Sequence, residues 1–367
     1  MNTKKSSNYG KIIAFFLIAS VLLCILGFAA EGWQTDSQDE IHTNTSGKLP
    51  VDDKNEDIGT GGDYNDNEPQ GPIFINPLTG LESTSLISAT RPVSFTVDSD
   101  SPVYGLSYAD ILIEFPTETN TTRYLSITGN YRSIGKLGSI GPSRGFINNL
   151  ASYFGSILIS AGMDDTVEYN HINISSYHFD LSSISGYHYT EYTHLKYTNG
   201  SLIEAGIKNA NINSVIESNY SLPFSFNSST QTNLGEMTAT HITLPITSDV
   251  RTELTYSSLE NKYILTKNGE SRVDLLSDTN LSYENAFILF SDCMTYESSK
   301  GVELIMDTVT SGIGYYARGG TLSRIQWRVT DGKMNFYNDN GEPLSAIPGK
   351  TYISFMKSSK MDTVIFS

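Results

Sequence analysis

Short apolar runs, separated by turn-forming residues, dominate the chain from position 73 onward and predict strands. Ile111–Phe115 and Arg123–Thr128 have the length and composition of buried strands, and the polar segment between them fits an antiparallel pair. Val93–Asp98 and Ser156–Ala161 are two further predicted strands. We therefore expect a sheet to organise this region.

Helical spacing of apolar residues occurs twice in the same region. Phe146–Phe154 and Leu202–Val215 place apolar residues three and four positions apart, as on one face of a helix. Gly135–Gly145, which holds four glycines and one proline, is predicted as a tight loop. Residues 73–223 are thus predicted to form a mixed α/β domain.

The pattern changes after Met237, where strand-like runs alternate with hairpin turns. Asn-Gly and Asp-Gly pairs between short strands are strong hairpin signals. The predicted fold class is therefore α+β, with a mixed α/β N-terminal domain followed by a mostly β C-terminal domain. The predicted strands of the second domain are His241–Ile246, Leu254–Tyr256, Tyr263–Thr266, Ala286–Phe290, Val302–Asp307, Gly314–Ala317, Ile325–Thr330, Met334–Tyr337 and Thr351–Phe355.

Composition divides the chain into five segments. Residues 31–72 carry eleven acidic residues against Lys48 and Lys54 and few aliphatics, so they cannot bury enough apolar surface to offset the entropy of folding. The region after them is longer than one core usually spans. The predicted segments are a membrane anchor or signal segment at 1–30, an acidic disordered linker at 31–72, the N-terminal domain at 73–223, a linker at 224–236 and the C-terminal domain at 237–367.

The N-terminal apolar run predicts attachment to a membrane. Ile12–Ala30 is free of charge and long enough to cross a bilayer, and the preceding lysines place the body on the extracytoplasmic side. An uncleaved single-pass anchor is the favoured interpretation. The alternatives are a secretory signal cleaved near Gly27–Ala29 and a lipid anchor on Cys24, which lacks the usual small residue before it.

Charge and cysteine content narrow the range of partners. The formal net charge is −16 and no basic stripe is present, so nucleic acid is not an expected partner. Cys24 lies inside the apolar run and Cys293 in the body, so no disulfide is expected. Asp63–Glu68 lacks the central glycine and terminal glutamate of a calcium loop. No metal and no cofactor are predicted.

Candidate chemistry surrounds the first predicted strand pair. Glu114 interrupts an apolar strand and needs a partner, because an unpaired buried charge is costly. Arg123 is the expected partner, either in a structural ion pair or as part of a ligand-facing acid and base. Glycines such as Gly141 let the backbone approach an anion, and Arg144 suits carboxylate or phosphate. An ordinary loop with a solvated arginine is the alternative.

A segment rich in histidine and tyrosine, His171–Tyr197, is a candidate recognition surface. Its histidines are spaced by seven, ten and six positions, which matches no short metal motif. Flat tyrosine rings suit stacking on sugars or peptides. Ordinary packing at a domain edge is the alternative.

Several phrases resemble the YerB-like family of bacterial membrane-attached lipoproteins, which is described as a pair of domains of unknown function (DUF 3048). The resemblance implies an envelope location and no known cofactor. The matching phrases are Pro77–Gly80, Arg91–Val93, Gly105–Glu114, Thr122–Leu125, Ile140–Arg144, His194–Thr198, Gly312–Gly320, Ile325–Arg328 and Phe336–Phe355.

The chain departs from the family pattern at two polar positions. The family usually has a second arginine soon after the one matching Arg144, where this chain reads Gly145–Asn149. A family His-Ala-Gly phrase reads Ser160–Gly162 here. His194 is kept.

The sequence favours a membrane-anchored extracytoplasmic protein that binds a cell-wall polymer or an envelope protein. The alternatives are a wall-acting hydrolase or transferase that uses Glu114 and His194, and a receptor for a small anion at Gly135–Arg144. The sequence contains no recognisable nucleophile motif, so it leaves open whether the protein is an enzyme. The candidate ligand-binding residues are Glu114, Arg123, Gly141, Ser143, Arg144, His194 and Tyr197.

Overall fold

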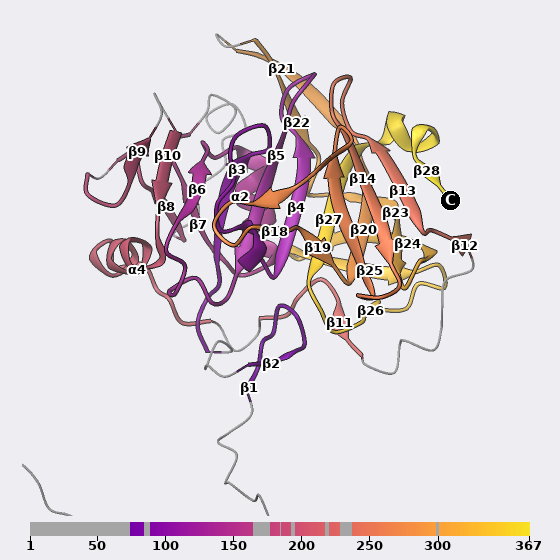
Figure 1. Cartoon of the computed structure of the whole chain (residues 1–367), viewed down its shortest axis with the longest axis horizontal. Coiled ribbons are helices and arrows are strands. Elements are labelled where there is room, and N and C mark those ends of the chain that lie inside the picture. Colours follow the sequence, from indigo (N-terminus) through magenta and orange to yellow (C-terminus); the bar gives the residue numbers. More distant parts are fainter. Residues whose placement is uncertain are drawn as a thin grey trace, which may run out of the picture. The chain divides into compact units, whose positions relative to one another are not determined.

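One large twisted sheet runs through the part of the chain that the structure describes (Figure 1). In this computed structural model, the described residues are 74–83, 89–163, 177–183, 185–191, 195–216, 220–227, 237–298 and 301–367, all within one compact unit that spans Asn67–Ser367. The sheet has 14 strands. Its main path is β12 (Met237–Thr238), β24 (Thr321–Thr330), β23 (Ser311–Arg318), β20 (Asn285–Ser291), β27 (Thr351–Lys357), β4 (Ile111–Pro116), β5 (Thr122–Thr128), β3 (Val93–Asp98), β6 (Leu137–Ile140), β10 (Leu195–Thr198) and β9 (Tyr189–Glu191).

The strands at the N-terminal end of this path follow the sequence pattern closely. β4 and β5 are antiparallel neighbours, as predicted. β3 pairs with β5 and with β7 (Ile157–Ser160), and β8 (His178–Asp180) extends β7. The glycine-rich segment that was predicted as a loop contains a strand, β6, because β10 supplies hydrogen-bond partners from a distant part of the chain.

Hairpins build the C-terminal part, as the Asn-Gly and Asp-Gly signals predict. Asn268 and Gly269 both have positive φ, as do Asp331 and Gly332, which a tight primed turn requires. A second, six-stranded sheet consists of β16 (Glu270–Ser271), β15 (Lys262–Lys267), β14 (Arg251–Ser257), β13 (His241–Pro245), β28 (Ile365–Phe366) and β19 (Ser282–Tyr283). The remaining strands are β1 (Phe74–Ile75), β2 (Glu82–Ser83), β11 (Ser225–Phe226), β17 (Val273–Asp274), β18 (Thr279–Asn280), β21 (Cys293–Ser298), β22 (Gly301–Met306), β25 (Lys333–Asn338) and β26 (Ser345–Ala346).

The two faces of the large sheet are buried in different ways. One face shares a core with the six-stranded sheet, where Val97 and Tyr124 join Leu254 and Tyr263. The other face is covered in part by α2 (Gly145–Tyr153), through Phe146 and other apolar residues. The other described helices are α4 (Gly200–Asn209) and the short 3-10 segments η1 (Leu106–Tyr108) and η4 (Ser358–Thr363).

Strand β27 joins the predicted N- and C-terminal domains within one sheet. It lies between β20 and β4 and runs parallel to both. Of the predicted linker 224–236, the structure describes 224–227, and Ser225–Phe226 pairs with β26. The two regions therefore share main-chain hydrogen bonds and core, whatever boundary is drawn between them.

The predicted α+β class is wrong, because the described structure is mostly β, including the region expected to be mixed α/β. Both predicted helices exist, but α4 ends at Asn209, well before Val215, which forms an isolated bridge with Thr90. Strand pairing, rather than helix packing, builds most of the N-terminal region.

Within the described residues, no helix has both the length and the apolar character needed to cross a membrane. The predicted anchor at Ile12–Ala30 lies outside the residues that the structure describes.

Candidate functional site

Glu114 lies in the buried interface between the large and the six-stranded sheets. Its side chain is fully buried, and its carboxylate accepts hydrogen bonds from three hydroxyl groups. Thr122 Oγ1 donates at 2.8 Å, Thr252 Oγ1 at 2.9 Å and the Tyr352 hydroxyl at 2.6 Å. Hydrogen bonds to a charged group are the stronger kind, so these three donors stabilise the carboxylate.

Arg123 does not pair with Glu114, so the expected ion pair is wrong. Phe115 lies opposite Arg123 in the register, and Tyr124 lies opposite Glu114. Because side chains alternate across a strand, the two groups point to opposite faces of the sheet. Arg123 Nε instead lies 3.9 Å from Asp98 Oδ1 and faces Gly141, whose added Cβ would lie 3.8 Å from Nε.

Arg144 lies near Arg123 on this second face, at the start of α2. Its guanidinium is buried and donates to the carbonyl of Thr117 at 2.9 Å. Glu118 Oε1 lies 2.5 Å from Nη2, and Glu303 Oε2 lies 3.2 Å from Nη1. Arg144 therefore ties the β4–β5 loop to the hairpin β21–β22 and is not a solvated loop residue.

Ser143 and Gly162 lie side by side next to this arginine. The Ser143 amide donates to the Gly162 carbonyl at 2.9 Å. Ser160, at the family's histidine position, has its Oγ 2.7 Å from His178 Nε2. Burial lowers the pKa of His178, although the nearby Asp180 opposes this effect. A histidine thus remains at this corner, supplied by another strand.

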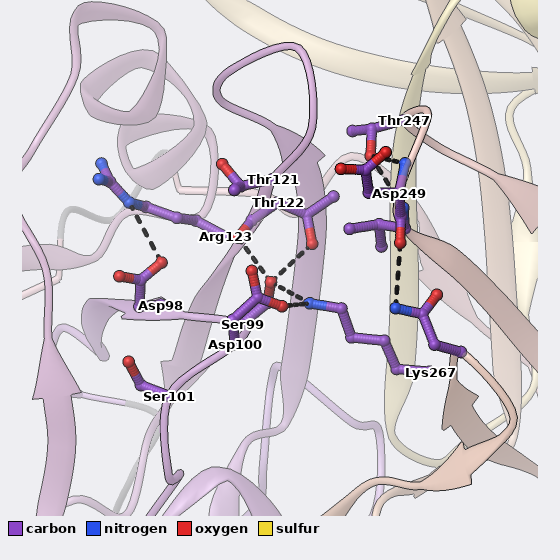
Figure 2. A network of polar contacts seen from close by, with 12 residues as sticks. Asp98, Ser99, Asp100, Ser101, Thr121, Thr122, Arg123, Thr247, Asp249 and Lys267 are labelled. Atoms are coloured by element: carbon purple, nitrogen blue, oxygen red, sulfur yellow. Dashed lines mark hydrogen bonds and ion pairs between the residues drawn. The ribbon is translucent and has the colours of Figure 1, made fainter. Parts of the chain in front are cut away.

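A second polar network joins the end of β3 to the six-stranded sheet (Figure 2). Lys267 Nζ donates to Ser99 Oγ and Asp100 Oδ1, both at 2.5 Å. Ser99 Oγ also donates to the Thr122 carbonyl at 2.6 Å. Burial raises the pKa of Asp98, the last residue of β3, although Arg123 opposes this effect. Every one of these groups has a partner within the protein, which is typical of a structural joint.

A cavity of about 410 Å³ opens between η1 and the six-stranded sheet. Its lining includes Leu106 and Ser107 from η1, Lys262 and Ile264 from β15, Ser282 from β19, and Lys350. Lys350 Nζ donates to the Ser107 carbonyl, and burial lowers the pKa of Lys350, although Asp110 and Glu284 oppose this effect. The cavity therefore combines a partly buried amine with hydroxyl groups and apolar carbons.

Tyr197 lies apart from both networks, in what we call the tyrosine cage: Tyr104, Tyr189, Tyr197 and Glu191 around the Lys136 ammonium. Lys136 Nζ lies 3.8 Å from the ring centroid of Tyr104 and 4.4 Å from that of Tyr197. Glu191 Oε2 accepts from Nζ at 2.7 Å. Partial burial lowers the pKa of Lys136, but the Glu191 carboxylate and the Tyr104 and Tyr189 hydroxyls together outweigh this effect, and the pKa is raised.

The seven candidate residues thus occupy different places. Arg123, Gly141, Ser143 and Arg144 gather at one end of the sheet, whereas Glu114 faces the other side and Tyr197 lies in the tyrosine cage. His194 lies outside the described residues. Sequence reasoning missed Lys136, which lies against the cage rings, and Lys350, which lines the cavity. Among the described residues, no group of three metal-binding side chains occurs.

Comparison with known proteins places this architecture in a family. The chain is 24% identical over 291 residues to "Putative lipoprotein YerB" of Bacillus subtilis (strain 168), covering 76% of this chain and 85% of the relative. The crystal structure of YerB protein from Bacillus subtilis superposes with a TM-score of 0.68 at 21% identity, covering 80% of this chain and 99% of that one. Residues 78–213 match the N-terminal domain model, and residues 242–353 the C-terminal domain model, of "Protein of unknown function (DUF3048)". The chain belongs to this DUF3048 family.

Proposed function

We propose that this protein is a membrane-anchored extracytoplasmic binding protein that takes up a polar fragment of the cell envelope in the cavity beside η1. The apolar run Ile12–Ala30 and the acidic segment that follows it supply an anchor and a spacer. The name of the Bacillus subtilis relative, a putative lipoprotein, supports attachment to a membrane. The extracytoplasmic side follows from the lysines that precede the apolar run.

The cavity is the observation on which the proposal rests. Residues of both family domains line it, since Leu106 and Ser107 belong to the first and Lys262 and Ile264 to the second. Its volume of about 410 Å³ falls in the range of small-ligand sites. Hydroxyl groups and the Lys350 amine can hydrogen-bond a hydroxyl-rich or anionic fragment, while Leu106 and Ile264 can pack against its apolar carbons.

Binding fits the geometry better than catalysis by Glu114. A general acid or base must reach the proton that it transfers, at hydrogen-bond distance or through one water. The Glu114 side chain is fully buried, and three hydroxyl groups already occupy its carboxylate. A hydrolase or transferase that uses Glu114 would need both sheets to separate locally before a polymer could reach it.

Calorimetric titration of the full chain in detergent, with soluble wall fragments from an enzymatic digest, tests the proposal. Ile264→Trp fills the cavity and should weaken binding at least tenfold. Thr266→Trp is the matched control, because Thr266 lies on the same face of β15 outside the cavity lining, and it should leave affinity unchanged. Failure of the wild type to bind any fragment, or equal binding by Ile264→Trp, would remove the cavity as the site.

A further inference from the structure

The tyrosine cage is assembled by a row of four residues across adjacent backbone segments. Tyr104 bridges to Gly138, Gly138 pairs with Tyr197 in β10, and Tyr197 pairs with Tyr189 in β9. Residues that face each other across neighbouring strands project their side chains to the same side of the sheet. Three tyrosine rings therefore gather on one side of this outer part of the sheet.

Gly138 allows the rings to meet, because it adds no side chain to the row. A Cβ at this position would lie 2.9 Å from Tyr197 Cδ1, closer than real Cβ contacts allow. Because glycine has no Cβ, the Tyr104 and Tyr197 rings meet edge to face with centroids 5.6 Å apart. Tyr189 stacks on Tyr197 with ring centroids 6.0 Å apart. The backbone pairing thus places the three tyrosine side chains on one side of the sheet, next to one another.

The cage has the chemistry of an ammonium-binding site. Aromatic faces attract cations through the ring quadrupole, and a carboxylate adds a charge-assisted hydrogen bond. Glu191 supplies that carboxylate at 2.7 Å from the ammonium. The side chains of Lys136 and Glu191 are 18% and 35% exposed, so the site lies at the surface and solvent reaches it.

Lys136 fills this site through a long, flexible side chain that can leave without a change in the backbone. It stands two positions before Gly138, immediately before β6 begins. An internal ligand of this kind competes with any external one. The apparent affinity for the external ligand is the intrinsic affinity multiplied by the fraction of time that the site is open. The rings and Glu191 would remain in place, since the backbone segments that carry them pair through β6 and with one another.

We propose that the tyrosine cage recognises an organic ammonium group of an envelope component, with Lys136 acting as a built-in competitor. The site is separate from the cavity beside η1, because no residue of the cage lines that cavity. The ligand class is a primary or methylated ammonium group. A primary ammonium group can donate hydrogen bonds to Glu191, whereas a fully methylated one, such as that of choline, cannot.

Ligand-observed NMR and calorimetry on the full chain test the proposal with choline and n-butylammonium as probes. 3,3-Dimethylbutan-1-ol, which has the shape of choline without its charge, is the control ligand. Lys136→Ala empties the cage and should bind at least one of the two cations at least tenfold more tightly than wild type does. Lys136→Gln serves the same purpose if the alanine variant folds poorly, and Lys208→Ala, an exposed change on α4, should behave like wild type.

Ring substitutions separate the cage from non-specific attraction. In the Lys136→Ala background, Tyr104→Leu should weaken cation binding at least tenfold, whereas Tyr108→Leu, at an exposed tyrosine four positions away, should not. Tighter binding of choline would identify a methylated group, and tighter binding of n-butylammonium a primary amine. The proposal would be overturned if neither Lys136 variant bound either cation, or if the neutral alcohol bound as tightly as the cations. It would also be overturned if Tyr104→Leu left cation binding unchanged.

Discussion

At the scale of single residues, the hydroxyl donors of the buried Glu114 carboxylate are expected to contribute measurably to the free energy of unfolding. Tyr352→Phe removes the donor at 2.6 Å and leaves the ring in place. A hydrogen bond to a charged group contributes about 1.5–3 kcal/mol, so we expect the free energy of unfolding to fall by about that amount. Urea denaturation at neutral pH measures it.

The matched control is Tyr263→Phe. Tyr263 is equally buried, but its hydroxyl donates to the neutral carbonyl of Ala239 at 3.0 Å. Its loss should cost about 0.5–1.5 kcal/mol. Equal losses in the two variants would mean that the charge on Glu114 contributes nothing beyond an ordinary acceptor.

Glu114 also shows how far sequence reasoning reaches at this scale. Its position inside an apolar strand correctly indicates a buried acid that needs partners. Two of those partners, Thr252 and Tyr352, stand 138 and 238 positions away along the chain. No local pattern connects such residues, so the sequence points to the nearer Arg123, which strand alternation places on the opposite face of the sheet.

At the scale of elements, Glu118 and Arg144 hold the β4–β5 loop in place. Burial raises the pKa of Glu118, but hydrogen bonds from Thr121 and Thr117 and the charges of Arg144 and Arg123 outweigh it, so the pKa lies below the usual value of 4.5. A carboxyl whose pKa is lowered by folding stabilises the protein above its unfolded pKa. It loses that contribution as the pH falls through the folded pKa.

We therefore expect Glu118→Gln to destabilise the protein more at pH 7 than at acidic pH. The difference in unfolding free energy between wild type and variant should shrink as the pH falls below about 4.5. Urea denaturation at pH 7, 5 and 3.5 gives the three values. Glu297→Gln, an exposed change on β21 of the neighbouring hairpin, is the control variant at the same three pH values. A constant difference across the three pH values would contradict the role assigned to Glu118.

Elements with local pairing were the predictable ones. The hairpins of the C-terminal region carry their own turn signals, and all nine predicted strands there coincide with observed ones. β6 is not predicted because glycines normally weaken a strand, and its partners β3 and β10 both lie elsewhere in the chain. The α+β class was wrong for the same reason, since non-local pairing adds strands that no single segment indicates.

At the scale of the whole molecule, β27 makes the N- and C-terminal regions depend on each other. Without β27, β4 would become a sheet edge with unpaired backbone groups, and Glu114 would lose the Tyr352 hydroxyl. The six-stranded sheet adds further contacts to the N-terminal region, since Thr252 on β14 donates to Glu114 and Lys267 on β15 donates to Ser99 and Asp100 (Figure 2). The two regions matched by separate domain models are therefore expected to fold as one unit.

Residues 73–223 expressed alone should consequently fail to form a stable domain, and co-expression with residues 224–367 should restore a folded complex. A two-dimensional amide NMR spectrum of the isolated segment should lack dispersion, and its urea denaturation should show no cooperative transition. The same measurements on residues 73–367 should show one transition, because the regions share a sheet and a core. A dispersed spectrum and a cooperative transition for the isolated segment would instead mean that its β3–β6 strands suffice for a core. In that case β27 would join two independent domains, and the cavity between η1 and β15 would open and close with their relative motion.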